Sequence, residues 1–273
     1  MPSVAVTNTF SSGTTAVASQ VNTNFSDLTT YINDRNSGLS KWDSLAVANN
    51  AVIDGTLSVG GSTIGAGNNG WTSVASETWT YATANSFTIS GDKTSVYSVG
   101  DKIKLTQSST VKYFYIYAVS YSAPNTTISI TGGIDYTFAN SAVSENYYSK
   151  LSTPNGFPSY FKYTPTATGI TGTTIVEGAF RLDQKLLSVM FNISGTSNST
   201  NFSITAPLSC VSISGFSSYL HNPINYIVDN NVQLTAGRSY IYLNNIYFYP
   251  NPTASWTASN TKTVVGISQG FIN

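Results

Sequence analysis

Charge is what this sequence has least of. Of its 273 residues only 9% are charged, 12 basic and 12 acidic, whereas soluble domains usually carry about 25% charged residues. A surface with so few charges produces little long-range field and so little steering toward polyanions. The composition therefore argues against a nucleic-acid partner. It favours a rugged β protein that contacts neutral surfaces, glycans among them.

Cysteine and histidine are nearly absent. Cys210 is the single cysteine, so the chain forms no internal disulfide, and its β-like surroundings indicate a buried small side chain. The single histidine, His221, stands in a turn-like setting before Asn222-Pro223. No cluster has zinc-ligand spacing, and no glycine-rich loop leads into Lys-Ser or Lys-Thr. The sequence therefore predicts no metal, no cofactor and no catalytic residue.

Catalysis by two carboxylates is the one chemistry that spacing alone does not exclude. A glycosidase needs only such a pair, and sequence separation does not place it. Because no repeat typical of a depolymerase is present, we expect no enzyme. The acidic residues available for such a pair are Asp135, Glu145, Glu177, Asp183 and Asp229.

Targeting signals are missing too. No apolar run reaches the roughly 18–20 residues that span a bilayer, and residues 1–4 begin no secretory signal. The composition nevertheless suits an exterior surface. We therefore expect a protein that is made in a cytoplasm, assembled into a particle and released by lysis.

Aromatic residues, by contrast, are plentiful. The 18 Tyr, 13 Phe and 4 Trp make up 13% of the chain, and 41% of the residues are hydrophobic. This is enough to bury real cores, so the polar bias does not indicate disorder. The abundant Ser, Thr and Asn favour turns and short strands over helix interiors. We therefore predict an all-β protein.

One helix is expected, near the N-terminus. Its apolar residues recur every three or four positions from Val17 to Ile32, close to the 3.5-residue period of a coiled coil or of a helix docked on a partner. A helix this short is marginal alone in water, so it must pack on its own copies, its own domain or another protein. The predicted anchoring residues are Phe10, Val17, Val21, Phe25, Leu28 and Ile32.

Four parts follow along the chain. Residues 1–35 carry the helix, and residues 36–70 form a glycine-rich tether, either a floppy linker or an arm that orders against neighbouring chains. Residues 71–153 read as a small β-barrel or sandwich, and residues 154–273 as a jelly-roll-like β-sandwich.

Two local patterns in the β domains predict particular structures. In 111–121, tyrosines alternate with Phe114 and Ile116, so both faces of that strand should be covered. In the C-terminal domain, 243–246 reads as a tight hairpin turn. The candidate strands of that domain are 174–181, 185–193, 201–206, 209–213, 225–228, 240–243, 246–249 and 262–268.

Aromatic residues gather again near the C-terminus, among Asn, Ser and Pro. Aromatic faces stack on sugar rings while Asn and Ser supply hydrogen bonds, so the candidate glycan-binding residues are Trp256, Tyr247 and Tyr249. Alternating tyrosines also fit a core or a trimer seam, which we favour for Tyr240 and Tyr242. Trp256 is equally compatible with exposure and with burial.

Three stretches resemble structural proteins of tailed bacteriophages. Residues 8–18 (NTFSSGTTAVA) with 21–28 (VNTNFSDL) resemble the particle-proximal segment of phage fibres. The strings GDKT at 91–94, VGDKIKL at 99–105 and TVKY at 110–113 are similar to a module of tail-fibre-like proteins. Residues 191–202 (FNISGTSNSTNF) are similar to a β-sandwich of fibre tips.

The resemblance implies a homotrimeric virion fibre, held to the phage particle by its N-terminus and presenting its C-terminus outward. Its partners would be other virion proteins of the tail, collar or capsid, and host surface polysaccharide. Two functions stay open: a receptor-binding tail fibre, and a head, neck or collar fibre or capsid decoration protein without a receptor site. A lectin outside any virion is a distant third.

Overall fold

A computed structural model describes residues 7–13, 15–36, 56–59, 62–65, 70–212, 220–250 and 255–273. Most of the predicted tether lies outside the described residues, as does Ile213 at the end of one predicted strand. The chain divides into two compact units, Met1–Ile53 and Asp54–Asn273, which are described separately. The four-part division of the sequence stays a prediction.

The first unit contains the predicted helix, α1 (Ala18–Asn36). Its sequence holds no Gly or Pro, and Gly38 follows shortly after its end. The segment before the helix is tied to it: Asn8 N donates to Asn24 Oδ1 at 2.9 Å, and Asn24 Nδ2 donates to Asn8 O at 2.8 Å. Among the described residues, no helix has both the length and the apolar character needed to cross a membrane.

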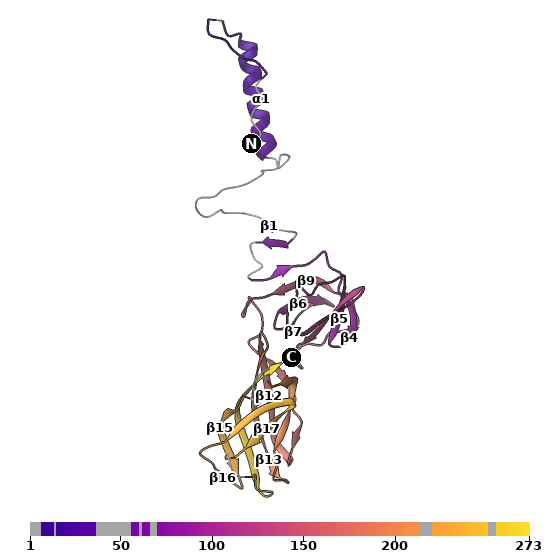
Figure 1. Cartoon of the computed structure of the whole chain (residues 1–273), viewed down its shortest axis with the longest axis vertical. Helices are drawn as coiled ribbons and strands as arrows, with labels where there is room; N and C mark the ends of the chain where they lie inside the picture. The colour runs from indigo at the N-terminus through magenta and orange to yellow at the C-terminus, as the bar shows by residue number, and fades with distance from the viewer. Residues whose placement is uncertain are drawn as a thin grey trace. The chain divides into compact units, whose positions relative to one another are not determined.

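The second unit contains two antiparallel sheets (Figure 1). The first sheet has the strand order β1-β2-β3-β9-β6-β7-β8-β5-β4. This confirms the all-β prediction, while the barrel, the jelly roll and the trimer remain predictions. The strands are β1 (Thr56–Val59), β2 (Ser62–Gly65), β3 (Thr72–Ser73), β4 (Thr80–Thr83), β5 (Ser86–Ser90), β6 (Lys102–Gln107), β7 (Thr110–Ser122), β8 (Asn125–Thr131) and β9 (Ser144–Ser149).

Strand β7 is covered on both faces in its centre, as its sequence predicts. Phe114 and Ile116 are buried in the core of the first sheet. Tyr115, one position out of phase, is buried with the core of the second sheet. The two cores therefore meet across a single strand.

The second sheet has the order β10-β12-β13-β18-β14-β17-β15-β16, with β11 paired to β14 and a further pairing of β15 with β18. Each candidate strand overlaps a strand of this sheet, but 201–206 and 209–213 belong to one strand with a register shift between Thr205 and Cys210, and 240–243 and 246–249 both belong to β17. The short strands β10, β11 and β16 match no candidate strand. The strands are β10 (Phe161–Tyr163), β11 (Ala167–Thr168), β12 (Ile170–Asp183), β13 (Leu186–Ser197), β14 (Ser203–Val211), β15 (Asn222–Asp229), β16 (Val232–Gln233), β17 (Arg238–Tyr249) and β18 (Thr261–Ile272).

Alternation decides which side chains of this sheet enter the core. On β13, Leu187, Val189, Phe191 and Ile193 are buried, and Cys210 on β14 is fully buried as predicted. On β18 the inward positions begin with a lysine, Lys262, which is 0% exposed. A charged side chain in such a position needs compensating partners.

The two sheets contact each other within the second unit. The rings of Tyr115 and Phe161 meet edge to face with centroids 5.3 Å apart. Gly100, at φ +89, approaches the turn between β12 and β13 so closely that an added Cβ would lie 2.3 Å from Gln184 Cα. Only glycine allows this approach.

Candidate binding site

Three tyrosines of β17 lie side by side, although two of them are at the opposite end of the strand from the third. The rings of Tyr240 and Tyr247 stack with centroids 5.3 Å apart, and those of Tyr240 and Tyr249 stack at 5.8 Å. In a straight strand Tyr240 and Tyr247 would be separated by more than about 20 Å. The chain therefore reverses within β17. Leu243, with φ +50, lies in the reversal, where the sequence predicts a hairpin turn.

The hairpin directs its tyrosines outward. Ser239, Ile241, Ile246 and Phe248 are buried, so the positions that alternate with them face away from the core. Tyr240, Tyr247 and Tyr249 are half-buried, and Tyr242 is 37% exposed. The expectation that Tyr240 and Tyr242 fill a core is wrong, because the inward positions of this hairpin are taken by Ser239, Ile241, Ile246 and Phe248.

These rings line a hollow of about 340 Å³, which we call the tyrosine hollow. Of the residues that the structure describes, all those lining the hollow are uncharged, and the set combines aromatic rings with hydroxyl and amide groups. Its residues are Thr200, Asn201, Phe202, Ser203, Tyr240, Tyr247, Phe248, Tyr249, Ser255 and Trp256. The structure thus brings together all three candidate glycan-binding residues of the sequence, Trp256, Tyr247 and Tyr249.

Trp256 contributes to the hollow as a wall rather than as an open platform. Its side chain is 3% exposed, and its indole Nε1–H donates to Phe248 O at 2.8 Å. Its ring meets Phe202 at an interplanar angle of 80°. Burial therefore decides the alternative that the sequence left open, and Trp256 is not a residue on which a sugar can stack.

The ends of the tyrosine stack differ in their neighbours. At Tyr249 the guanidinium carbon of Arg238 lies 5.5 Å from the ring centroid. His221 meets Tyr240 at its edge, 5.3 Å between centroids. Tyr247 is the end of the stack away from Arg238, and it pairs in register with Ser203 of β14. Tyr247 is thus the ring best placed to present a face to a ligand in the hollow.

Behind the wall of the hollow lies the buried ammonium of Lys262. Its Nζ donates to Gly169 O at 3.2 Å, to Asn201 O at 3.4 Å and to Ser199 O. The ring centroids of Phe202 and Trp256 lie 5.6 and 5.4 Å from it. Burial lowers the pKa of this ammonium to about 8, and the charge of Asp229 opposes the shift.

Sequence reasoning missed Lys262, although a signal exists. The residue falls in phase with Val264, Gly266, Ser268 and Ile272, the inward positions of β18. A lysine on the core side of an alternating strand is unusual. Gly169 completes the arrangement: at φ +89 its backbone comes so close to Asn201 that an added Cβ would lie 1.9 Å from Asn201 O.

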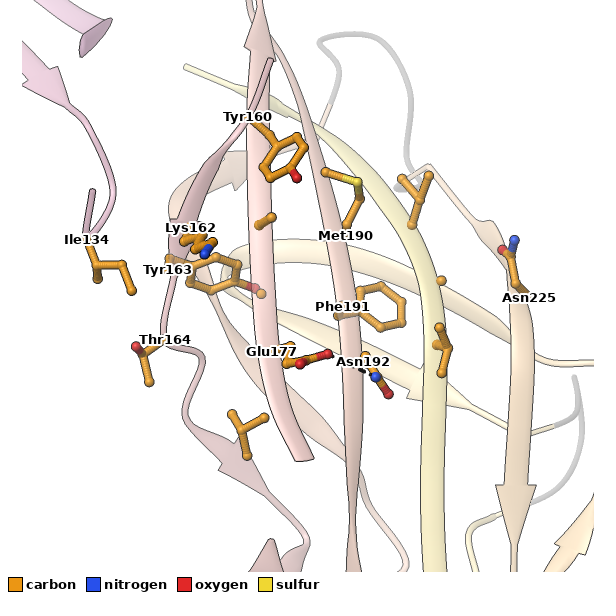
Figure 2. A pocket seen from close by; sticks show the side chains of 16 residues that line it. Ile134, Tyr160, Lys162, Tyr163, Thr164, Glu177, Met190, Phe191, Asn192 and Asn225 are labelled. Atoms are coloured by element: carbon orange, nitrogen blue, oxygen red, sulfur yellow. Dashed lines mark hydrogen bonds between the residues drawn. The ribbon is translucent and has the colours of Figure 1, made fainter. Parts of the chain in front are cut away.

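A second concavity, the outer groove, has a volume of about 560 Å³ (Figure 2). Its floor is the outward face of β12, β13 and β18, and Ile134 lies across from these strands (Figure 2). Most of its lining is apolar, including Met190 and Ile267, the latter 45% exposed. At the floor, Asn192 Nδ2 donates to Glu177 Oε2 at 3.0 Å.

The predicted anchoring residues lie on the first unit and are largely exposed. The exposed fractions are 42% for Phe10, 53% for Val17, 65% for Phe25, 40% for Leu28 and 47% for Ile32, and Val21 is half-buried. On α1, Val21, Phe25, Leu28 and Ile32 keep the seam spacing that the sequence indicates. An apolar helix face this open is unusual for an isolated helix in water.

The candidate carboxylates occupy separate settings. Glu145 accepts from Thr106, Asp135 from the backbone of Lys162, Glu177 from Asn192 and Asp229 from Thr257. In the part of the chain that the structure describes, no three His, Cys, Asp or Glu side chains gather as a metal site.

No family model, curated protein or solved structure matches the chain. The features of this chain that could bind a partner are therefore the tyrosine hollow, the outer groove and the apolar face of α1.

Proposed function

We propose that this chain is a homotrimeric fibre protein of a tailed-phage virion, whose C-terminal sheet binds uncharged glycans of the host surface. The observation that supports glycan binding is the tyrosine hollow, in which stacked rings and neutral hydrogen-bonding groups converge and the described lining residues are all uncharged. Sugar rings present C–H faces and many hydroxyls, which such a lining complements. The proposal assigns no hydrolytic step and no cofactor to the hollow.

Attachment to the particle is assigned to the N-terminal segment. The open apolar face of α1 gives three copies, or a virion protein, a surface to bury. Three hollows on one fibre would raise avidity without new contacts. Weak single-site binding, which stacking and neutral hydrogen bonds provide, is then sufficient.

The test of glycan binding compares the full-length protein with Tyr247→Ala on an array of uncharged bacterial polysaccharides. We expect the wild-type protein to bind at least one of these polysaccharides and the variant to bind it about tenfold more weakly. The magnitude is taken from nucleobases, whose stacking on an aromatic side chain contributes roughly 1–3 kcal/mol. Tyr121→Ala is the matched control, because Tyr121 is 44% exposed on β7 and does not line the hollow. Equal binding by all three proteins, or none by the wild type, would refute the proposal.

A second candidate function is a head, neck or collar fibre or decoration protein without a receptor site. The outer groove favours it, because exposed Ile267 and the half-buried Met190 provide a packing surface on the sheet. In that case Ile267→Asp should block incorporation into particles, while Tyr247→Ala leaves host adsorption unchanged.

A further inference from the structure

Lys262 touches the same residues that enclose the tyrosine hollow. Asn201, Phe202 and Trp256 line the hollow, and each of them also contacts the Lys262 ammonium. Gly169 and Ser199 supply the remaining carbonyl contacts. The lysine is therefore attached to the hollow's wall from behind, and it does not itself line the hollow.

The chemistry of these contacts matches an ammonium group. Lysine has three N–H donors and no acceptor, and three backbone carbonyls converge on it. Without a donor among them, the partial negative charges of three carbonyls would face one another. Among the described residues, Gly169 O would keep only the Asn198 amide and Ser199 O only the Ser197 hydroxyl as donors, and Asn201 O would lose its bond to the ammonium. The nearby rings of Phe202 and Trp256 add attraction for a cation.

We infer that Lys262 is the positioning residue of the tyrosine hollow, holding the segment from Ser199 to Phe202 and the Trp256 ring in the arrangement that a neutral glycan meets. The identity of the ligand rests on the proposed function, whereas the role of Lys262 in ordering the wall does not. The three stacked rings of Tyr240, Tyr247 and Tyr249 all belong to β17, which is held in the sheet by its own pairing with β14. Loss of the ammonium should therefore loosen one wall and leave the tyrosine stack in place.

Charged neighbours of Lys262 are few. Within the described residues, the carboxylate of Asp229 at the end of β15 is the ionisable group whose charge acts on it. That carboxylate accepts from Thr257 N at 2.9 Å and from Thr257 Oγ1 at 2.8 Å, one residue beyond Trp256. The contacts from Gly169, Ser199, Asn201 and the two rings are uncharged.

The primary test measures amide hydrogen exchange in the full-length protein and in Lys262→Met. Two amides report on the wall: Asn198 N donates to Gly169 O at 3.3 Å, and Trp256 N donates to Thr200 O at 3.3 Å. We expect both to exchange at least about tenfold faster in the variant, because the wall loses the hydrogen bonds that the ammonium makes to three of its carbonyls. The amides of Phe114 and Ile116 should keep their wild-type rates. Lys185→Met, at an exposed lysine, is the matched control and should change neither set.

A second measurement separates charge from packing. The variant Lys262→Cys is made in a Cys210→Ala background, so that residue 262 carries the chain's only thiol. The unfolded protein is alkylated either with 2-bromoethylamine, which restores an ammonium, or with 1-bromopropane, which gives a neutral side chain of the same length. Both products are then refolded. Protection of the wall amides should return with the ammonium and not with the propyl group. Equal protection in both would overturn the inference.

Failure of this inference and failure of the proposed function are distinguishable. Unchanged exchange of the wall amides in Lys262→Met, or faster exchange throughout both sheets, would refute a positioning role whatever the protein binds. If the wild type retains no polysaccharide of the array, the proposed function fails while the exchange result still decides the role of Lys262. If binding is found, Lys262→Met should weaken it about tenfold and Lys185→Met should not.

Discussion

Tyr240 stacks on Tyr247 across the reversal of β17, with ring centroids 5.3 Å apart and planes inclined by 22°. The ring of Tyr249 also stacks with that of Tyr240, with centroids 5.8 Å apart. Rings held in this way lose little conformational freedom when a ligand arrives, because the fold has already ordered them. The hairpin thus gives the hollow a pre-organised aromatic side.

Replacement of Trp256 should destabilise the fold rather than remove a sugar contact. Its side chain is 3% exposed and its indole N–H is bonded to Phe248 O, so Trp256→Ala should lower the free energy of unfolding by about 3–5 kcal/mol. Trp256→Phe keeps a ring but leaves that carbonyl without its donor, and should cost less. Urea denaturation of both variants measures this. A loss in Trp256→Ala below 1 kcal/mol would contradict the buried position.

The buried lysine makes stability depend on pH. The folded-state pKa of Lys262 is lowered to about 8, against about 10.4 for a lysine in an unfolded chain. Between these values the unfolded chain binds more protons, so this group's contribution to stability rises with pH. The difference in unfolding free energy between wild type and Lys262→Met should therefore shift in favour of the wild type from pH 8 to pH 10. A flat difference would show that the ammonium is not desolvated.

How much of this fold is visible in the sequence depends on the element. Strand β7 and the turn at Leu243 are predicted, because alternation and turn residues are local signals. Short strands such as β10 (Phe161–Tyr163), β11 (Ala167–Thr168) and β16 (Val232–Gln233) are not predicted, because two or three residues carry too little alternation to be recognised. The pairing order is not predicted, since β18 contacts β13, β14 and β15, and such long-range choices leave no local trace.

The candidate site is predicted in part. Tyr247, Tyr249 and Trp256 do come together, but the sequence favours a core position for Tyr240, because aromatic content alone does not reveal which phase of a hairpin faces inward. Lys262 was missed for a related reason. Its partners are backbone carbonyls of Gly169, Ser199 and Asn201, and carbonyl positions are set by the fold rather than by residue type.

The helix face should determine the oligomeric state. Phe25 and Leu28 are 65% and 40% exposed on α1, and a seam of such residues is stable only when copies cover it. Sedimentation of the full-length protein at micromolar concentration should give three times the chain mass, and Phe25→Ser combined with Leu28→Ser should shift it toward the monomer. Val17→Ser, outside the strict seam, is the milder control. A wild-type monomer would exclude the proposed trimer.

The N-terminal segment should also attach the protein to the particle. Residues 1–35 belong to a compact unit separate from both sheets, so their deletion should leave the sheets folded. We expect the truncated protein to show the circular dichroism of a β protein and to be missing from purified virions. Incorporation at the wild-type level would place the anchor elsewhere, and the outer groove would become the surface to test.

Glycan binding at the tyrosine hollow should be nearly independent of salt. Among the described residues no charged side chain lines the hollow, and the formal net charge of the chain is +0, so neither steering nor counterion release contributes to affinity. Between 50 and 300 mM NaCl, a range over which the Debye length falls from roughly 14 to 6 Å, the dissociation constant for a retained neutral polysaccharide should change less than about twofold. Arg238 is the sharpest control, because its guanidinium lies over Tyr249 at one end of the stack. If Arg238→Gln abolishes binding, or if added salt releases the polysaccharide, recognition depends on a charge that the hollow lacks, and the ligand is an acidic rather than a neutral glycan.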